Sequence, residues 1–136
     1  MSTTYAQPAP GEPVVFDYAR CGNPTRLCFE RNLAAMEKGK YAFACSSGMA
    51  AHVTIMNMLS SGDHILCVDD VYGGTQRYLN KILSPNAGIE VTLSDFSDIA
   101  EFKKQVRKNT KVCWLETPTN PTLKCFDIRA IANALK

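Results

Sequence analysis

The chain has 136 residues, of which 46% are hydrophobic and 21% charged, and its formal net charge is +2. This composition is typical of a folded globular domain and excludes a disordered chain. The Lys and Arg residues are scattered, without the basic stripe that binds a nucleic-acid backbone, and no stretch reaches the roughly 18 apolar residues of a membrane span. We therefore expect neither nucleic acid nor a membrane as a partner.

Strand-like and helix-like segments alternate along most of the chain. Residues 1–22 are rich in Pro and polar side chains, which predicts an extended N-terminal arm. Helices are expected at residues 23–39, 48–62, 74–84, 97–109 and 126–136. Strands are expected at residues 41–45, 64–70, 89–95 and 111–118. Alternation with short connections predicts an α/β fold with a mostly parallel sheet flanked by helices.

Six cysteines are present, and no two of them form a C-x-x-C pair. Cys45, Cys67 and Cys113 lie inside apolar, strand-like runs, where cysteine behaves as a small hydrophobic residue. This favours buried free thiols over disulfides or a zinc site, so we expect no metal and a reducing, cytoplasmic location.

The segment "CSSGMAAHVTIM" places small polar residues where a strand is expected to become a helix. Ligands of α/β proteins bind beyond the carboxyl ends of the strands, and the backbone N–H groups at a helix N-terminus favour an anion. Ser47, Gly48 and Met49 are therefore candidates for holding a phosphate. Ordinary helix capping is the alternative, and neither a Walker loop nor a G-x-G-x-x-G fingerprint is present.

Four segments occur in a characteristic order: "DYARCGNPTR", "CSSGMAA", "DDVYGGTQRY" and "ETPTNPT". Together they resemble the transsulfuration family, the pyridoxal-phosphate (PLP) enzymes of cysteine and methionine metabolism, nearest to its cystathionine gamma-lyase branch. The resemblance implies PLP as cofactor and residues 23–136 as part of the large PLP-binding domain of a fold-type I (aspartate aminotransferase-like) enzyme. It also implies homotetramers built from dimers with shared active sites.

The resemblance assigns the cofactor phosphate to Ser47, Gly48 and Met49. Tyr18 and Arg20 match a pair in the intersubunit arm that reaches the phosphate of a neighbouring subunit. Arginine suits that task because its planar guanidinium makes charge-assisted, bidentate hydrogen bonds.

Four further residues match positions around the cofactor ring and the substrate. Tyr72 matches the aromatic residue that stacks on the ring and can take part in proton transfer. Asn120 matches the asparagine that faces the 3′ oxygen of the ring. Arg77 and Glu116 match substrate-pocket residues, with an exposed helix arginine and an ion-paired strand-end carboxylate as the alternatives.

The implied activity is carbon–sulfur cleavage of L-cystathionine to cysteine, 2-oxobutyrate and ammonia. The family places its Schiff-base lysine in a Ser-x-x-Lys-type motif beyond Asn120, and no lysine here has Ser or Thr three residues before it. We therefore expect an N-terminal piece of such an enzyme, inactive by itself. A non-catalytic fragment that associates with full-length relatives, a gamma-synthase or beta-lyase relative, and a nucleotide-binding domain are the alternatives. His52 and His64 match no functional position and are interpreted as structural.

Overall fold

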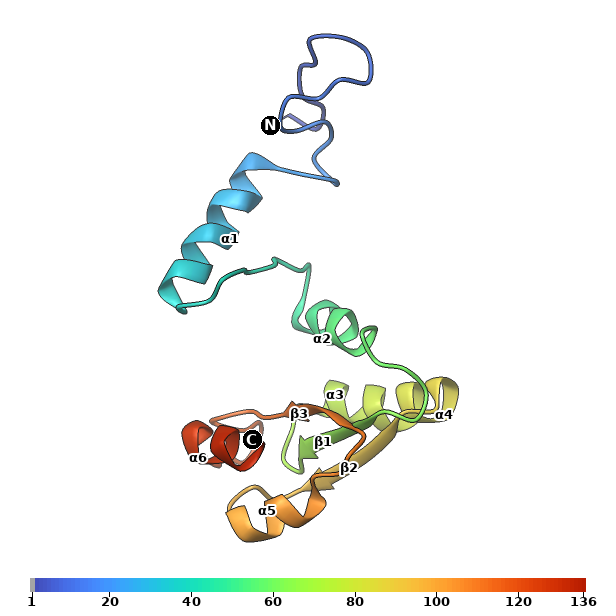
Figure 1. Cartoon of the computed structure of the whole chain (residues 1–136), viewed down its shortest axis with the longest axis vertical. Coiled ribbons are helices and arrows are strands. Elements are labelled where there is room, and N and C mark those ends of the chain that lie inside the picture. Colours follow the sequence, from blue (N-terminus) through green and yellow to red (C-terminus); the bar gives the residue numbers. More distant parts are fainter. Residues whose placement is uncertain (1) are drawn as a thin grey trace. The chain divides into compact units, whose positions relative to one another are not determined.

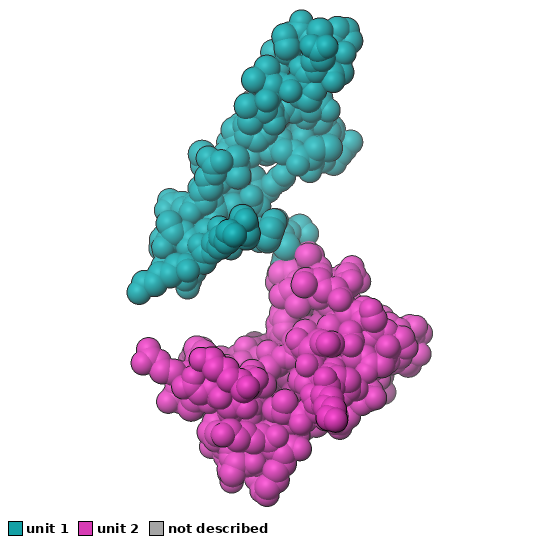
Figure 2. Space-filling model, viewed as in Figure 1, with its two compact units in different colours: residues 1–47 teal, residues 48–136 magenta. Residues whose placement is uncertain are grey.

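The computed structural model describes residues 2–136 (Figure 1). The chain forms two compact units, unit 1 up to Ser47 and unit 2 from Gly48 to Lys136 (Figure 2). Each unit is described by itself. The boundary that the sequence analysis places after Gly22, between arm and domain, stays a prediction.

Unit 1 contains one helix and a segment that folds back on itself. Thr4 and Tyr18 form an isolated antiparallel bridge. Helix α1 (Pro24–Met36) begins as expected, because Asn23 accepts a hydrogen bond from the backbone N–H of Arg26 at 3.0 Å and caps the helix.

The prediction of a strand at residues 41–45 is wrong. This segment is extended but pairs with no strand, and Phe43 is 80% exposed. A strand needs a neighbouring strand for its backbone hydrogen bonds, and the described part of unit 1 has none to offer. The backbone N–H of Ala44 instead donates to the Glu30 carboxylate at 2.8 Å.

Unit 2 is built on a parallel sheet of three strands in the order β2-β1-β3. The strands are β1 (His64–Val68), β2 (Glu90–Ser94) and β3 (Thr110–Trp114). Every residue of the central strand β1 is buried, which explains why its sequence does not alternate between apolar and polar residues. The predicted α/β fold with a parallel sheet is confirmed.

Helical segments connect and cover these strands. They are α2 (Gly48–Met56), α3 (Gly73–Tyr78), the π-helical turn η1 (Leu79–Leu83), α4 (Ser84–Ala87), α5 (Ile99–Gln105) and α6 (Ile128–Ala134). The helix expected to reach residue 62 ends earlier, at Met56, and residues 60–63 form a turn in which the Ser60 N–H donates to the Asp63 carboxylate at 2.8 Å. Among the described residues, no helix combines the length and apolarity needed to cross a membrane.

The core of unit 2 lies between the sheet and helices α5, α6 and η1. Phe96 and Phe102 are fully buried and meet edge to face, with ring centroids 4.8 Å apart. His64 is also buried, and its two ring nitrogens are hydrogen-bonded to Thr110 Oγ1 at 2.8 Å and Thr92 Oγ1 at 2.9 Å. This placement agrees with a structural role for His64.

Candidate functional site

Two loops that follow the carboxyl ends of β1 and β3 meet in unit 2. The backbone N–H of Tyr72, in the first loop, points to Glu116 Oε2 in the second at 3.4 Å. Asn120 lies four residues further along the second loop and is exposed. The structure thus brings together two of the loops to which the resemblance assigns the cofactor ring and the substrate.

Tyr72 directly precedes α3 and is 50% exposed. Its ring lies against the backbone of Gly74, where an added Cβ would come within 3.1 Å of the ring atoms Cδ1 and Cζ. An added Cβ at Gly73 would meet nothing within 4 Å. Because Gly74, the second glycine of "YGG", has no side chain, the Tyr72 ring can occupy the space beside it.

Helix α2 begins at Gly48, so the N–H groups of Gly48 and Met49 lie in its first turn, as expected. One turn further on, His52 Nδ1 is hydrogen-bonded to Thr75 Oγ1 at 2.9 Å, and the His52 ring meets the Trp114 ring edge-on at 4.2 Å. These contacts hold the middle of α2 beside the start of α3 and the end of β3.

These contacts agree with the interpretation of His52 as a structural residue. Its pKa is lowered, mainly by burial, while the negative charge of Glu116 acts in the opposite direction. The neutral imidazole is favoured, which suits a ring packed against an indole.

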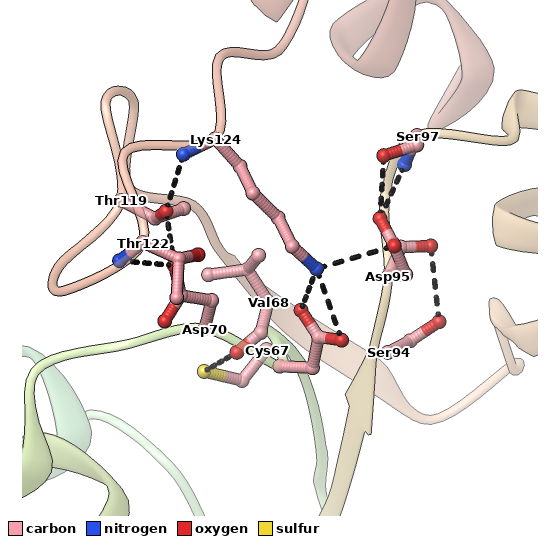
Figure 3. Close-up of polar contacts among 10 residues, drawn as sticks. Cys67, Val68, Asp70, Ser94, Asp95, Ser97, Thr119, Thr122 and Lys124 are labelled. Carbon is pink, nitrogen blue, oxygen red and sulfur yellow. Dashed lines mark hydrogen bonds and ion pairs between the residues drawn. The ribbon is translucent and has the colours of Figure 1, made fainter.

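The loop that carries Asn120 is fastened to Asp70 (Figure 3). The Asp70 carboxylate accepts hydrogen bonds from the hydroxyl groups of Thr119 and Thr122 and from the Thr122 backbone N–H, the last at 3.0 Å. These bonds, that of Thr119 first, lower the pKa of Asp70. The sequence analysis missed this role, and the only available signal was an Asp pair after a buried strand and two threonines around "NP".

Lys124 fastens the far end of the same loop. Its Nζ donates to Asp69 Oδ1 and to Asp95 Oδ2, each at 3.2 Å, and so links the carboxyl ends of β1 and β2 (Figure 3). The two carboxylates raise the pKa of Lys124, the hydrogen bond to Asp95 contributing most. Lys124 is charged at neutral pH and acts here as a structural cation.

The remaining predicted site residues lie elsewhere. Arg77 is exposed in the last turn of α3 and lines a surface cavity of about 310 Å³ together with Gln76 and Lys81. Tyr18 and Arg20 belong to unit 1, where the guanidinium carbon of Arg20 lies 4.4 Å from the centre of the Tyr18 ring. Their roles, like that of Ser47 at the end of unit 1, stay predictions.

All six cysteines are free thiols in the structure, but of the three expected to be buried only Cys67 is; Cys113 is half-buried, and Cys45 is exposed because residues 41–45 form no strand. Burial raises the pKa of Cys67 to about 12 and that of Cys113 to about 11, so both thiols stay protonated at neutral pH. Within residues 2–136, no group of three His, Cys, Asp or Glu side chains is placed to hold a metal ion.

The fold and the loops define a class of protein: a parallel α/β domain that presents helix N–H groups, a half-exposed aromatic ring and a polar loop at one edge of its sheet. Such sites suit an anionic, ring-containing ligand. Residues 1–136 match the family described as "Cys/Met metabolism PLP-dependent enzyme". The chain belongs to this family, whose cofactor is pyridoxal 5′-phosphate.

Relatives and solved structures agree with this assignment. The chain is 47% identical over 133 residues to cystathionine gamma-lyase of Homo sapiens, covering 98% of this chain and 33% of that protein. It is 42% identical over 135 residues to cystathionine beta-lyase of Coxiella burnetii, covering 99% and 35%. The crystal structure of metB from Corynebacterium glutamicum aligns with a TM-score of 0.92 at 44% identity, over 98% of this chain and 35% of that one. The chain thus spans about a third of the length of these relatives.

The residues present fit this cofactor. An added Cβ at Gly48 would meet nothing within 4 Å, so the space at the start of α2 is open where a phosphate would meet the helix N–H groups. The Tyr72 ring is half-exposed and Asn120 is exposed, so both are accessible to a ligand.

Proposed function

We propose that the chain is part of a PLP-dependent carbon–sulfur lyase that acts on L-cystathionine. The observation that carries this proposal is the meeting, in one unit, of the loops that bear Tyr72 and Glu116, together with the contact of helix α2 with α3 through His52 and Thr75. The names of the relatives support a cystathionine lyase. The gamma reaction is our choice, because gamma-lyases are the more similar of these relatives.

The chain's own residues would hold the cofactor as follows. Gly48 and Met49 donate backbone N–H groups to the phosphate, which the helix dipole also stabilises. Tyr72 stacks on the pyridine ring, and the Asn120 amide donates to the 3′ oxygen. When bound, PLP supplies an electron sink that permits cleavage of bonds near the substrate's α-carbon.

The remaining groups would act on the substrate. Arg77 pairs with a substrate carboxylate and Glu116 with a substrate ammonium group, because these are the complementary charges of an amino acid. The Tyr72 hydroxyl exchanges a proton with the substrate at the edge of the ring. Tyr18 and Arg20 serve the phosphate of a neighbouring subunit in a homotetramer.

We further propose that the 136-residue chain binds the cofactor without a covalent bond and has no lyase activity by itself, since no lysine of this sequence has the Ser or Thr three residues before it that the family's Schiff-base motif contains. The cytoplasmic location expected from the cysteines belongs to the same proposal.

The test uses the fluorescence of Trp114, the only tryptophan. Pyridoxamine 5′-phosphate is the probe, because it lacks the aldehyde that reacts with surface lysines. We expect saturable quenching by this compound and weaker binding of pyridoxamine, which has no phosphate. Absence of saturable quenching would overturn the proposal, and equal quenching by ATP would overturn it in favour of the nucleotide-binding alternative.

A second function, association with full-length relatives, is favoured by the surface of unit 1. Its exposed apolar side chains include Val14, Phe29, Met36 and Phe43, which are 57–80% exposed. Exposed apolar surface of this kind is typical of interaction sites. We expect this chain to co-elute with a full-length cystathionine gamma-lyase in size-exclusion chromatography, and separate elution of the two proteins would exclude this function.

A further inference from the structure

We propose that Asp70 is a positioning residue that fixes the Asn120 loop at a set place relative to Tyr72. This inference rests on the proposed function, because it concerns the two side chains assigned to the cofactor ring. Asp70 itself touches neither the cofactor nor the substrate in this proposal. It acts through Thr119 and Thr122.

The hydrogen bonds leave Asn120 little freedom. Thr119 and Thr122 both bond to the Asp70 carboxylate, and only Asn120 and Pro121 lie between them (Figure 3). The Thr119 side chain is 1% exposed, and its hydroxyl also accepts the Lys124 backbone N–H at 2.8 Å. Asn120 is therefore next to a residue whose hydroxyl group is held on two sides.

The backbone around Asp70, at the other end of these hydrogen bonds, is also held in place. Asp70 follows β1 by two residues, and Val71, which separates it from Tyr72, is buried in the core with 5% exposure. The buried Val71 side chain anchors the backbone next to Asp70. One carboxylate thus joins the start of the Tyr72 loop to a loop about fifty residues further along the chain.

The chemistry of the acceptor explains why a carboxylate stands here. All three donors share the Oδ2 oxygen of Asp70, and an ionised carboxylate strengthens each of these hydrogen bonds by its charge. An asparagine at position 70 would keep one carbonyl oxygen as acceptor but lose the charge, and so preserve part of the link. An alanine would leave the Thr119 hydroxyl, which is buried, without its acceptor.

The experiment compares the Asp70→Ala, Asp70→Asn and Asn120→Ala variants of the 136-residue chain. The probe is pyridoxamine 5′-phosphate, followed by Trp114 quenching and by its own absorption band, which responds to hydrogen bonding at the 3′ oxygen. We expect Asp70→Ala to weaken binding about tenfold and to shift the band as Asn120→Ala does. Asp70→Asn should give an intermediate effect, and the double variant Asp70→Ala/Asn120→Ala should show no further shift.

Asp98→Ala is the matched control. Asp98 caps α5 by accepting the N–H groups of Ala100 and Glu101, so its loss destabilises the fold without touching the Asn120 loop. We expect a lowered thermal midpoint and an unchanged absorption band. A merely structural role for Asp70 would make Asp70→Ala behave like this control, which would overturn the inference.

Amide hydrogen exchange separates failure of the inference from failure of the proposed function. Asp70→Ala should speed exchange at Thr119, Thr122 and Lys124, whose N–H groups are hydrogen-bonded within the loop or to Asp70. It should leave the amides of β2 unchanged. If the unsubstituted chain does not bind the probe, the proposed function fails while this exchange pattern still decides whether Asp70 fixes the loop. Unchanged exchange in the loop would overturn the inference even if the probe binds.

Discussion

Gly73 and Gly74 both follow Tyr72, but only Gly74 lies against its ring. We expect Gly74→Ala to displace the ring and weaken binding of pyridoxamine 5′-phosphate about tenfold, because the ring loses its place over the cofactor. Gly73→Ala is the matched control, since its Cβ would enter open space. Titration of Trp114 fluorescence measures both variants, and equal affinities would contradict the prediction.

Both histidines give stability a pH dependence of known sign. Burial is the largest cause that lowers the pKa of His52 and of His64 from the ordinary 6.5; at His64, Arg107 lowers it further and Glu90 opposes. The unfolded chain therefore binds protons at a higher pH than the folded chain does. The free energy of unfolding should contain the whole contribution of the two neutral histidines above about pH 6.5 and should fall as the pH drops below this value.

Urea denaturation between about pH 7.5 and about pH 5 checks this expectation. In a His52→Gln/His64→Gln variant the unfolding free energy should change less with pH in this window, although the variant itself will be less stable. The pKa values of Asp70 and Asp95 are lowered from 3.8. Their contributions to the unfolding free energy are therefore lost only at more acidic pH, outside this window. A wild-type stability that stays constant across the window would contradict the prediction.

At the scale of the elements, α5 is held to the sheet by Phe102. This side chain is fully buried and meets Phe96 edge to face. Phe102→Ala should lower the free energy of unfolding by about 3–5 kcal/mol through lost burial and a cavity. Phe43→Ala, at a position 80% exposed, should change it by no more than about 0.5 kcal/mol. Urea denaturation of the two variants distinguishes them, and similar effects would contradict this account of the core.

The strands of unit 2 could be predicted because their sequences are apolar where the strands are buried in the sheet. "HILCV" has no polar alternation, and β1 is covered on both faces. The same reasoning failed for residues 41–45, since an apolar segment becomes a strand only where another strand accepts its hydrogen bonds. Local pattern therefore predicted the strands of unit 2, but it could not show whether a partner strand was present, and the lack of one made the prediction for residues 41–45 wrong.

In the candidate site, too, some residues could be placed from the sequence and others could not. Gly48 at the start of a helix and Tyr72 and Glu116 at strand ends could be placed from the sequence, because each follows from the end of a local element. Asp70 could not, since its partners Thr119 and Thr122 lie 49 and 52 residues away along the chain. His52 was expected to be structural, but its partners Thr75 and Trp114 could not be named, because these contacts exist only after the sheet has formed.

At the scale of the whole molecule, the two units differ in what they bury. Among the described residues of unit 1, Ala34 is the only buried hydrophobic one, whereas the core of unit 2 includes Ile65, Leu66, Val68 and Phe102. A helix of 13 residues such as α1 is marginal in water without tertiary packing. We expect unit 1 to open locally at a free energy far below that of global unfolding.

Native-state hydrogen exchange of the full chain measures this difference. Amides of α1 should exchange through local opening, with little dependence on denaturant, while those of β1 should exchange only through global unfolding. Addition of a full-length cystathionine gamma-lyase should slow exchange in α1 if unit 1 is an association surface, because a partner would cover its apolar side chains. Equal protection of α1 and β1 in the chain alone would contradict the difference between the units, and unchanged α1 exchange with the partner would count against association.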